Sequence, residues 1–251
     1  MALPFSYEGK RVVVSGGGGA GMGAAAVEGL AELGAEIHVL DLKDPPVKVA
    51  SHQTADLRDP DAVAAAVDKI GGKIDALFNA AGLPGAPFPD VDTMLVNFKS
   101  ALYGMQAVLP HFKQRGSGQV INVSSMLGRL PLTSFRSAYI AAKHALNGLT
   151  GAFRQELRAE FPNIIFTTVS PAVVATDFGL NARGGGPDSR LLPMAQPVEE
   201  VADVIVDVID HPRVDVYTRP GAQQMVADYY ASPDMAQAEA AFFIPAPAGK
   251  H

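Results

Sequence analysis

A tyrosine and a lysine four residues apart could carry out proton transfer. The sequence reads Tyr-Ile-Ala-Ala-Lys from Tyr139 to Lys143, and on a helix this spacing puts both side chains on one face, about one turn apart. A tyrosine hydroxyl ordinarily titrates near pH ~10, and an ammonium beside it lowers that pKa toward neutrality, where a general acid/base works best. The same pair is also common on solvated helices, so its meaning depends on the elements around it.

A glycine-rich segment follows the first predicted strand. Residues 11–15 contain three consecutive valines, which is typical of a strand buried on both faces. Residues 16–23 then read Gly-Gly-Gly-Gly-Ala-Gly-Met-Gly, and an alanine-rich helix follows. In this order the bare backbone can approach a dinucleotide pyrophosphate, and the helix N-terminus offers it free N–H groups. A flexible linker is the alternative, and the flanking strand and helix disfavour it.

An acidic residue ends the second predicted strand, residues 36–40. Asp41 lies 18 residues after Gly23, where a carboxylate can accept hydrogen bonds from the adenosine ribose. The 2′-phosphate of NADP would face this carboxylate at a cost on the order of 1–2 kcal/mol after screening. Lys43 is the nearby candidate cation, and the Asp-Pro-Pro of residues 44–46 is expected to turn the chain first. The sequence therefore predicts NAD as the cofactor.

Strands and helices alternate through the rest of the chain. Further strands are predicted to lead into 55–57 and to cover 74–78, 119–123, 164–169 and 214–217, with helices over 61–70, 93–112, about 139–160, 198–209 and up to about 230, before a Pro- and Ala-rich tail. This alternation predicts an α/β fold of Rossmann type, a doubly wound parallel sheet of about seven strands with helices on both faces. We expect one domain, 1–251, with a substrate lid at 177–197 and a C-terminal extension at 221–251.

Composition excludes several classes of protein. The 251 residues are 48% hydrophobic and 18% charged, as expected of a soluble protein with a large core. There is no cysteine, and the six histidines do not cluster, so we expect neither disulfides nor a metal site. A net charge of −6 without a basic run disfavours nucleic acid as a partner. Because no apolar stretch reaches the ~18 residues of a membrane span and no targeting pattern opens the chain, a cytoplasmic enzyme is expected.

Several motifs in combination resemble the short-chain dehydrogenase/reductase family over nearly the whole chain. The family's glycine signature is Thr-Gly-x-x-x-Gly-x-Gly. Gly17, Gly21 and Gly23 match this spacing with Gly16 in the threonine place. In the other alignment Ser15 stands for the threonine and one residue is inserted.

The family's catalytic order of Asn, Ser, Tyr and Lys is matched by Asn97, Ser125, Tyr139 and Lys143. The spacing from Ser125 to Tyr139 is one residue longer than is common, so Ser124 remains an alternative. The resemblance implies that Tyr139 supplies the proton, that Ser125 orients the carbonyl, and that Lys143 lowers the tyrosine pKa and holds the nicotinamide ribose. It also implies that Asn97 anchors a water that relays protons to solvent.

The resemblance further implies which residues hold the dinucleotide. Besides Gly17, Gly21, Gly23 and Asp41, they are Met22, Asp56, Leu57, Asn79, Ala80, Ala81, Tyr139, Lys143, Pro171, Val174 and Thr176. The implied reaction is interconversion of a secondary alcohol and a ketone with NAD(H). Apolar residues after Thr176 and around 242–244 suggest a hydrophobic substrate, such as a cyclic or steroid-like one.

The resemblance also implies a homotetramer, or a dimer, built through the helices that contain Asn97 and Tyr139. The apolar residues offered for this pairing are Leu95, Val96, Phe98, Leu102, Val108, Ala141, Ala145, Leu149 and Phe153. Two other functions stay open, a non-catalytic dinucleotide sensor and an NADP(H)-dependent carbonyl reductase of the oxoacyl type. A Gly-x-Ser-x-Gly elbow is absent around Ser125, which disfavours a hydrolase.

Overall fold

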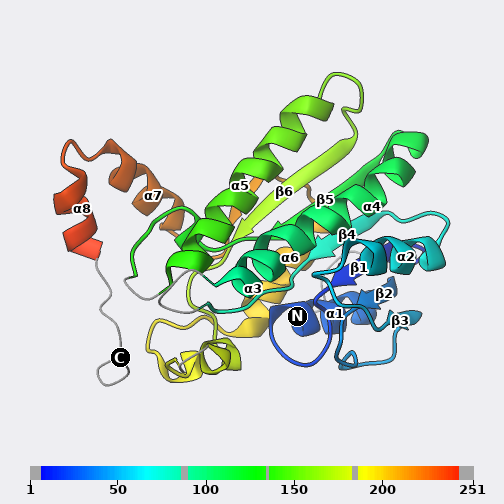
Figure 1. Ribbon diagram of the computed structural model, residues 1–251, viewed down its shortest axis with the longest axis horizontal. Helices are drawn as coiled ribbons and strands as arrows, with labels where there is room; N and C mark the ends of the chain where they lie inside the picture. Colours follow the sequence, from blue (N-terminus) through cyan, green and yellow to red (C-terminus); the bar gives the residue numbers. More distant parts are fainter. Residues whose placement is uncertain (1–6, 86–89, 134–135, 183–185, 243–251) are drawn as a thin grey trace.

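A seven-stranded parallel sheet forms the centre of the computed structural model, which describes residues 7–85, 90–133, 136–182 and 186–242 (Figure 1). The strands are β1 (Arg11–Ser15), β2 (Glu36–Leu40), β3 (Ser51–Gln53), β4 (Ala76–Asn79), β5 (Gly118–Val123), β6 (Ile164–Ser170) and β7 (Asp215–Tyr217). Their order across the sheet is β3-β2-β1-β4-β5-β6-β7, and all neighbours are parallel. Because the chain winds outward in both directions from β1 and β4, a crevice opens at their carboxyl ends. The predicted doubly wound sheet is confirmed.

Helices cover both faces of this sheet. They are α1 (Met22–Glu32), α2 (Pro60–Ile70), α3 (Val91–Met94), α4 (Ser100–Arg115), α5 (Ser137–Leu157), α6 (Val198–Asp210), α7 (Ala222–Ala231) and α8 (Met235–Phe242). The helices α1 and α6 pack together over one face, and α2, α4 and α5 cover the other (Figure 1). Successive side chains of β1 explain its run of valines, because Val12 and Val14 join the first core and Val13 joins the second.

The helix predicted over 93–112 is interrupted. It consists of α3, a π-helical stretch Leu95–Lys99 and α4. Asn97 lies in the π-helical stretch, and its side-chain amide binds both the N–H and the C=O of Leu83, at 2.6 and 2.7 Å. A π-helical turn holds one residue more than an α-helical turn, and here it lets a buried amide face a neighbouring loop.

The third strand ends at Gln53 and leads into residues 55–57, as predicted. One other sequence prediction needs correction. The predicted tail contains a helix, α8, whose first turn is held by Asp234, since Gln237 N donates to its Oδ1 at 3.1 Å. This helix packs into a small cluster with Tyr229 and Leu130. Phe243 and Ile244, which were expected to shape the substrate site, lie outside the described residues.

Candidate active site

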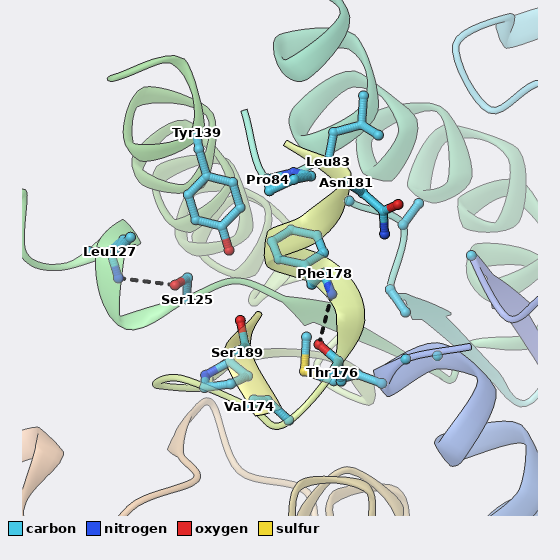
Figure 2. A pocket seen from close by; sticks show the side chains of 18 of the residues that line it. Leu83, Pro84, Ser125, Leu127, Tyr139, Val174, Thr176, Phe178, Asn181 and Ser189 are labelled. Atoms are coloured by element: carbon cyan, nitrogen blue, oxygen red, sulfur yellow. Dashed lines mark hydrogen bonds between the residues drawn. The ribbon is translucent and has the colours of Figure 1, made fainter. Parts of the chain in front are cut away.

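A cavity of about 1070 Å³ lies at the carboxyl ends of the strands. Its walls come from the glycine loop, the ends of β2, β4, β5 and β6, residues 176–194 and the start of α7. Figure 2 shows its inner part, where residues far apart in the sequence converge on one space. This is the position at which open α/β sheets bind ligands.

Ser15 links the start of the glycine loop to the neighbouring strand. Its hydroxyl donates to Asn79 Oδ1 at 3.1 Å, across the strands β1 and β4. This contact is compatible with the alignment in which Ser15 stands for the threonine and one residue is inserted. In that alignment Gly16 is the first glycine. It has φ +81°, and a Cβ there would lie 2.4 Å from Ala81 N. Gly17 faces the core instead of the cavity, because a Cβ there would lie 2.8 Å from Val14 Cγ1.

The rest of the loop fits a pyrophosphate. Gly21 lines the cavity with φ +112°, and the space beside its Cα is open for 4 Å. At Gly23 a Cβ would lie 2.0 Å from Gly16 O, so the loop folds tightly under the cavity. No side chain caps the N-terminus of α1, which leaves N–H groups and the positive helix dipole for an anion. Met22 also lines the cavity.

Asp41 lies in the cavity wall and also holds the glycine loop. Its carboxylate accepts from Gly18 N at 2.9 Å and from Lys43 N at 3.0 Å. The chain bends at residues 41–43, and the Lys43 side chain lies along Gly19, where a Cβ would be 2.9 Å from Lys43 Cδ. One carboxylate and one ammonium therefore flank the place where an adenosine ribose would bind.

Asp56 and Leu57 line the same end of the cavity. The guanidinium of Arg58 contacts the Asp56 carboxylate at 2.6 Å and that of Asp92 at 3.3 Å. Hydrogen bonding to Arg58 holds the pKa of Asp56 below its ordinary value. This contact ties the exit of β3 to α3.

Asn79, predicted to bind the cofactor, belongs to a buried chain of hydrogen bonds. Besides accepting from Ser15, it donates through Nδ2 to Asn122 Oδ1 at 2.8 Å, and Asn122 donates to Thr150 Oγ1 at 2.9 Å. The chain joins β1, β4, β5 and α5 beneath the cavity. The neighbouring Ala80 and Ala81 do line the cavity.

Tyr139 and Ser125 face each other in the cavity. Figure 2 shows the two hydroxyl groups directed into one space, beside the ring of Phe178. That ring meets Tyr139 edge to face, with centroids 6.0 Å apart. Ser125 Oγ accepts from Leu127 N at 3.1 Å. The Ser124 hydroxyl instead points at α5 and donates to the carbonyl oxygen of residue 143 at 3.4 Å, so the geometry favours Ser125 as the serine beside the substrate.

Lys143 is buried next to the tyrosine. Its Nζ donates to Val123 O at 2.8 Å and lies 5.8 Å from the centre of the Tyr139 ring. Burial lowers the pKa of Lys143 to about 8. Burial also raises the pKa of Tyr139, which is opposite to the predicted direction, and the groups that oppose this rise are Ser125 and Arg136 instead of the lysine.

Sequence reasoning missed Arg136. It is the residue before α5, three positions ahead of Tyr139, and it lines the cavity. Burial lowers its pKa, and the nearby Tyr139 raises it. Its position in the sequence, about one helical turn before Tyr139, could have indicated that it lies on the same side of α5 as the tyrosine.

Asn97 lies beneath the cavity and is 1% exposed. Both polar ends of its side chain are engaged by the backbone of Leu83. Its observed role is to position the loop that follows β4, and its part in a proton relay stays a prediction.

The segment expected to contact nicotinamide follows β6. Pro171, Val174 and Thr176 all line the cavity. The carbonyl of Pro171 accepts from Met126 N at 2.8 Å, and Thr176 Oγ1 accepts from Phe178 N at 3.3 Å. The first bond holds the end of β6 against the loop after Ser125. The second caps the N-terminus of the short helix Asp177–Asn181.

The described part of the expected lid contains two short 3₁₀ helices, Asp177–Asn181 and Ser189–Leu191. Gly186, predicted to be a hinge, instead packs tightly, since a Cβ there would lie 2.4 Å from Gly179 O. The other two proposed hinges, Gly184 and Gly185, lie outside the described residues.

Metal sites and membrane-spanning helices are both absent from the described part of the chain. It contains no group of three or more His, Cys, Asp or Glu side chains placed to hold a metal ion. None of its helices is both long and apolar enough to cross a membrane.

Comparison with known proteins identifies the family. Residues 10–184 match the family model described as short chain dehydrogenase. The chain belongs to the short-chain dehydrogenase family. Among curated short-chain dehydrogenase relatives, D-xylose 1-dehydrogenase of Caulobacter vibrioides is 34% identical over 199 residues, which are 70% of this chain and 76% of that protein. Dehydrogenase/reductase SDR family member 7B of Bos taurus is 36% identical over 170 residues, 61% of this chain and 51% of its own length.

Solved short-chain dehydrogenases share the whole fold. One from Burkholderia cenocepacia, in complex with NADP, has a TM-score of 0.78 at 25% identity and covers 96% of this chain and 100% of its own. One from Burkholderia phymatum, in complex with NAD, has a TM-score of 0.78 at 21% identity and covers 90% and 94%. This protein is an oxidoreductase of the short-chain dehydrogenase family.

Proposed function

We propose that this short-chain dehydrogenase interconverts a secondary alcohol and a ketone with NAD(H), on a hydrophobic substrate of up to cyclic or steroid-like size. The main support for this proposal is that Tyr139 and Ser125 present their hydroxyl groups to one cavity. The glycine loop and Asp41 form the other end of this cavity. A dinucleotide held by that loop would supply the redox chemistry. Side chains of the protein would stabilise the charge on the substrate oxygen and donate the proton.

Ser125 is set up to donate to a substrate oxygen. Its own oxygen accepts from Leu127 N, and its hydroxyl group interacts with that of Tyr139, so a substrate oxygen that bound between the two hydroxyl groups could accept from both. Reduction of a ketone leaves negative charge on the carbonyl oxygen, and a donor fixed in advance stabilises that charge most. Tyr139, beside it, would donate the proton that completes the alcohol.

The protonation of Tyr139 suits reduction at neutral pH. Burial raises its pKa, so the group is a phenol that can donate. Alcohol oxidation needs the phenolate, which forms only as the pH rises. Lys143, with a pKa of about 8, would carry positive charge near Tyr139 at neutral pH and would also be placed to hold a nicotinamide ribose.

The walls around Tyr139 support a hydrophobic substrate. Apolar side chains dominate there, among them Leu83, Pro84, Leu127, Leu132, Leu192 and Met194. A volume of about 1070 Å³ exceeds what a dinucleotide site needs alone and leaves room for a ring-sized body.

An NADP(H)-dependent carbonyl reductase is the second candidate. It is favoured by Lys43, which lies along the glycine loop at Gly19, where a phosphate on the adenosine ribose could reach it. Asp41 opposes this choice because its carboxylate, which accepts from Gly18 N, would face the negatively charged 2′-phosphate.

The test is a screen of ketones and secondary alcohols with both cofactors, run on the wild type and on Tyr139→Phe. The variant keeps the ring that meets Phe178 and loses only the proton donor. We expect its kcat to fall at least ~100-fold with unchanged cofactor affinity, measured by quenching of NADH fluorescence. Near-normal turnover by the variant would disprove the mechanism, and cofactor binding without turnover of any substrate by the wild type would favour a sensor.

A further inference from the structure

The helix α7 forms one wall of the cavity but lies outside the layers of the sheet. Figure 1 shows α7 and α8 projecting beyond the edge of the sheet, away from the helices that cover its two faces. The turn before α7 and its first residues contribute Arg219, Pro220, Ala222 and Met225 to the cavity lining. The position of this wall therefore depends on contacts with the loops around it.

One of these contacts is a buried pair of side-chain hydrogen bonds at the base of α7. Gln196 Nε2 donates to Thr218 O at 3.0 Å, and Thr218 Oγ1 donates to Gln196 Oε1 at 2.8 Å. Gln196 is 8% exposed and Thr218 is 7% exposed, so a group that lost its partner here would be left unsatisfied. Both polar ends of the glutamine side chain are engaged by the residue that follows β7.

The backbone of Gln196 binds a second segment of the cavity wall. Its N–H donates to Val173 O at 2.9 Å, and its carbonyl oxygen accepts from Ala175 N at 2.8 Å. Val173, Val174 and Thr176 line the cavity on the side where nicotinamide is expected. Gln196 thus connects the exit of β6, through its backbone, to the base of α7, through its side chain.

Other contacts of α7 are more exposed or lie further along the helix. Arg219 donates to the carbonyl oxygen of Met194, and Tyr230 Oη donates to Arg129 O at 2.8 Å, both at the surface. Water can replace a lost partner at such exposed bonds, so they hold the helix less firmly than a buried pair. Tyr229 packs in a small apolar cluster near the end of α7. The start of α7, which faces the cavity, therefore depends most on Gln196.

We propose that Gln196 is a positioning residue for the substrate. By tying Thr218 to the exit of β6, it fixes where the wall formed by α7 stands, and this wall favours a substrate bulky enough to contact it. A bulky ketone would contact Met225, whereas a three-carbon ketone would need only the space at Tyr139 and Ser125. The inference rests on the proposed oxidoreductase function and names what sets the size of its substrate.

The experiment compares the reduction of 1-decalone, a ketone of two fused rings, with the reduction of propanone. The ratio of kcat/KM for decalone over propanone cancels changes in the folded fraction and in NADH binding. In the wild type we expect decalone to be favoured, because it buries more apolar surface against the wall. Gln196→Met keeps the length of the side chain and loses both hydrogen bonds, so this ratio should fall about ten-fold.

Thr218→Val removes only the hydroxyl group and should lower the same ratio by a smaller factor. The double variant should be no worse than Gln196→Met alone, because both changes break one contact. An unchanged ratio in Gln196→Met would overturn the inference. If Gln196→Met did not fold, an unchanged ratio in Thr218→Val would overturn it.

Gln119→Met is the matched control. Gln119 is 7% exposed, and its Nε2 also donates to a backbone carbonyl, that of Val208, at 2.7 Å. It lies near the start of β5, at the end of the strand away from the cavity. The variant should lower the melting temperature and leave the decalone-to-propanone ratio unchanged. An equal fall of the ratio in Gln119→Met would assign the effect to lost stability and overturn the inference.

Hydrogen exchange tests the positioning step without a substrate. The backbone amides of α7 should exchange faster in Gln196→Met than in wild type or in Gln119→Met, because the helix opens locally more easily. Unchanged exchange in α7 of Gln196→Met would overturn the positioning role.

Two results for the wild type separate this inference from the proposed function. A wild type that reduces ketones without preferring decalone over propanone would overturn the inference and leave the proposed function standing. A wild type that reduces no ketone and oxidises no secondary alcohol of the screen with either cofactor would refute the proposed function, and this inference with it.

Discussion

The positive charge of Arg136 lowers the pKa of Tyr139. Burial raises the pKa, while Ser125 and Arg136 lower it. Lys143 lies on the same helix and loses its charge near pH 8. Without the guanidinium, the pKa of Tyr139 must rise further, so the phenolate needed for alcohol oxidation forms at higher pH.

We therefore predict that Arg136→Met moves the acidic limb of the pH profile of kcat/KM for alcohol oxidation to higher pH. The profile should be measured with a neutral alcohol, so that the substrate does not titrate. Arg136→Lys restores a cation and should return the limb toward its wild-type position. A limb that stayed in place in Arg136→Met would show that its charge does not act on the tyrosine.

Asp41 carries the prediction on cofactor choice. We expect wild type to prefer NADH over NADPH by ten-fold or more in kcat/KM, and Asp41→Ala to narrow this gap because the like charge facing the 2′-phosphate is removed. Asp41→Ala also removes the bonds to Gly18 and Lys43, so both cofactors should bind more weakly. Lys43→Ala is the control, and it should leave the preference for NADH in place. Equal use of both cofactors by wild type would show that Asp41 does not select the cofactor.

The sequence could locate Tyr139, Ser125 and Lys143 because their signal is local, namely spacing on one helix and position at a strand end. It did not identify Arg136 as a cavity residue, because position one turn ahead of Tyr139 is a weak signal and the cavity is closed by segments distant in the chain. The direction of the tyrosine pKa was wrong for the same reason. The burial of Tyr139 depends on how Phe178 packs against its ring, and the pattern of residue types in the sequence does not predict that contact.

At the scale of elements, the helices and strands of the sheet were predictable because apolar patterning fixes which faces are buried. The π-helical stretch around Asn97 was not, because its side chain is held by Leu83, 14 residues earlier. The helix α8 was missed because prolines near the end of the chain outweighed its alanines in the interpretation. Alanine has the highest helix propensity of all residues.

The glycine contact within the lid gives a prediction for this element. In Gly186→Ala a methyl group would meet Gly179 O, so the two arms of residues 177–192 must separate. We expect KM for the substrate to rise several-fold while NADH affinity changes little. The control is Gly148→Ala in α5, where no atom lies within 4 Å of the new methyl group, and it should leave KM unchanged. An unaltered KM in Gly186→Ala would argue against a role of this contact in substrate binding.

For the whole molecule, the family resemblance predicts a tetramer paired through α4 and α5. The structure reduces the surface offered for this, because Val108 is fully buried and Phe153 stacks on Phe166 within the chain. Ala141 remains exposed on α5. Partner helices would cover such a small residue closely.

We predict a tetramer by light scattering at micromolar concentration, and smaller species for Ala141→Glu, because a carboxylate would be desolvated between the helices. Ala64→Glu makes the same change at an exposed position of α2 and should leave the assembly intact. A monomeric wild type would refute the prediction.

The buried hydrogen bonds among Ser15, Asn79 and Asn122 have a consequence for how the sheet is assembled. These residues are direct neighbours across β1, β4 and β5, so they form one polar rung in otherwise apolar strands. A shift of one strand by a single residue would leave buried amide groups without hydrogen-bond partners, which costs about 1–3 kcal/mol of stability for each unpaired group. That penalty is a large fraction of the net stability of a typical domain. These hydrogen bonds thus favour the native strand register during folding. Because they lie directly beneath the carboxyl ends of the strands, the native register also brings the loops that carry the candidate catalytic residues next to one another.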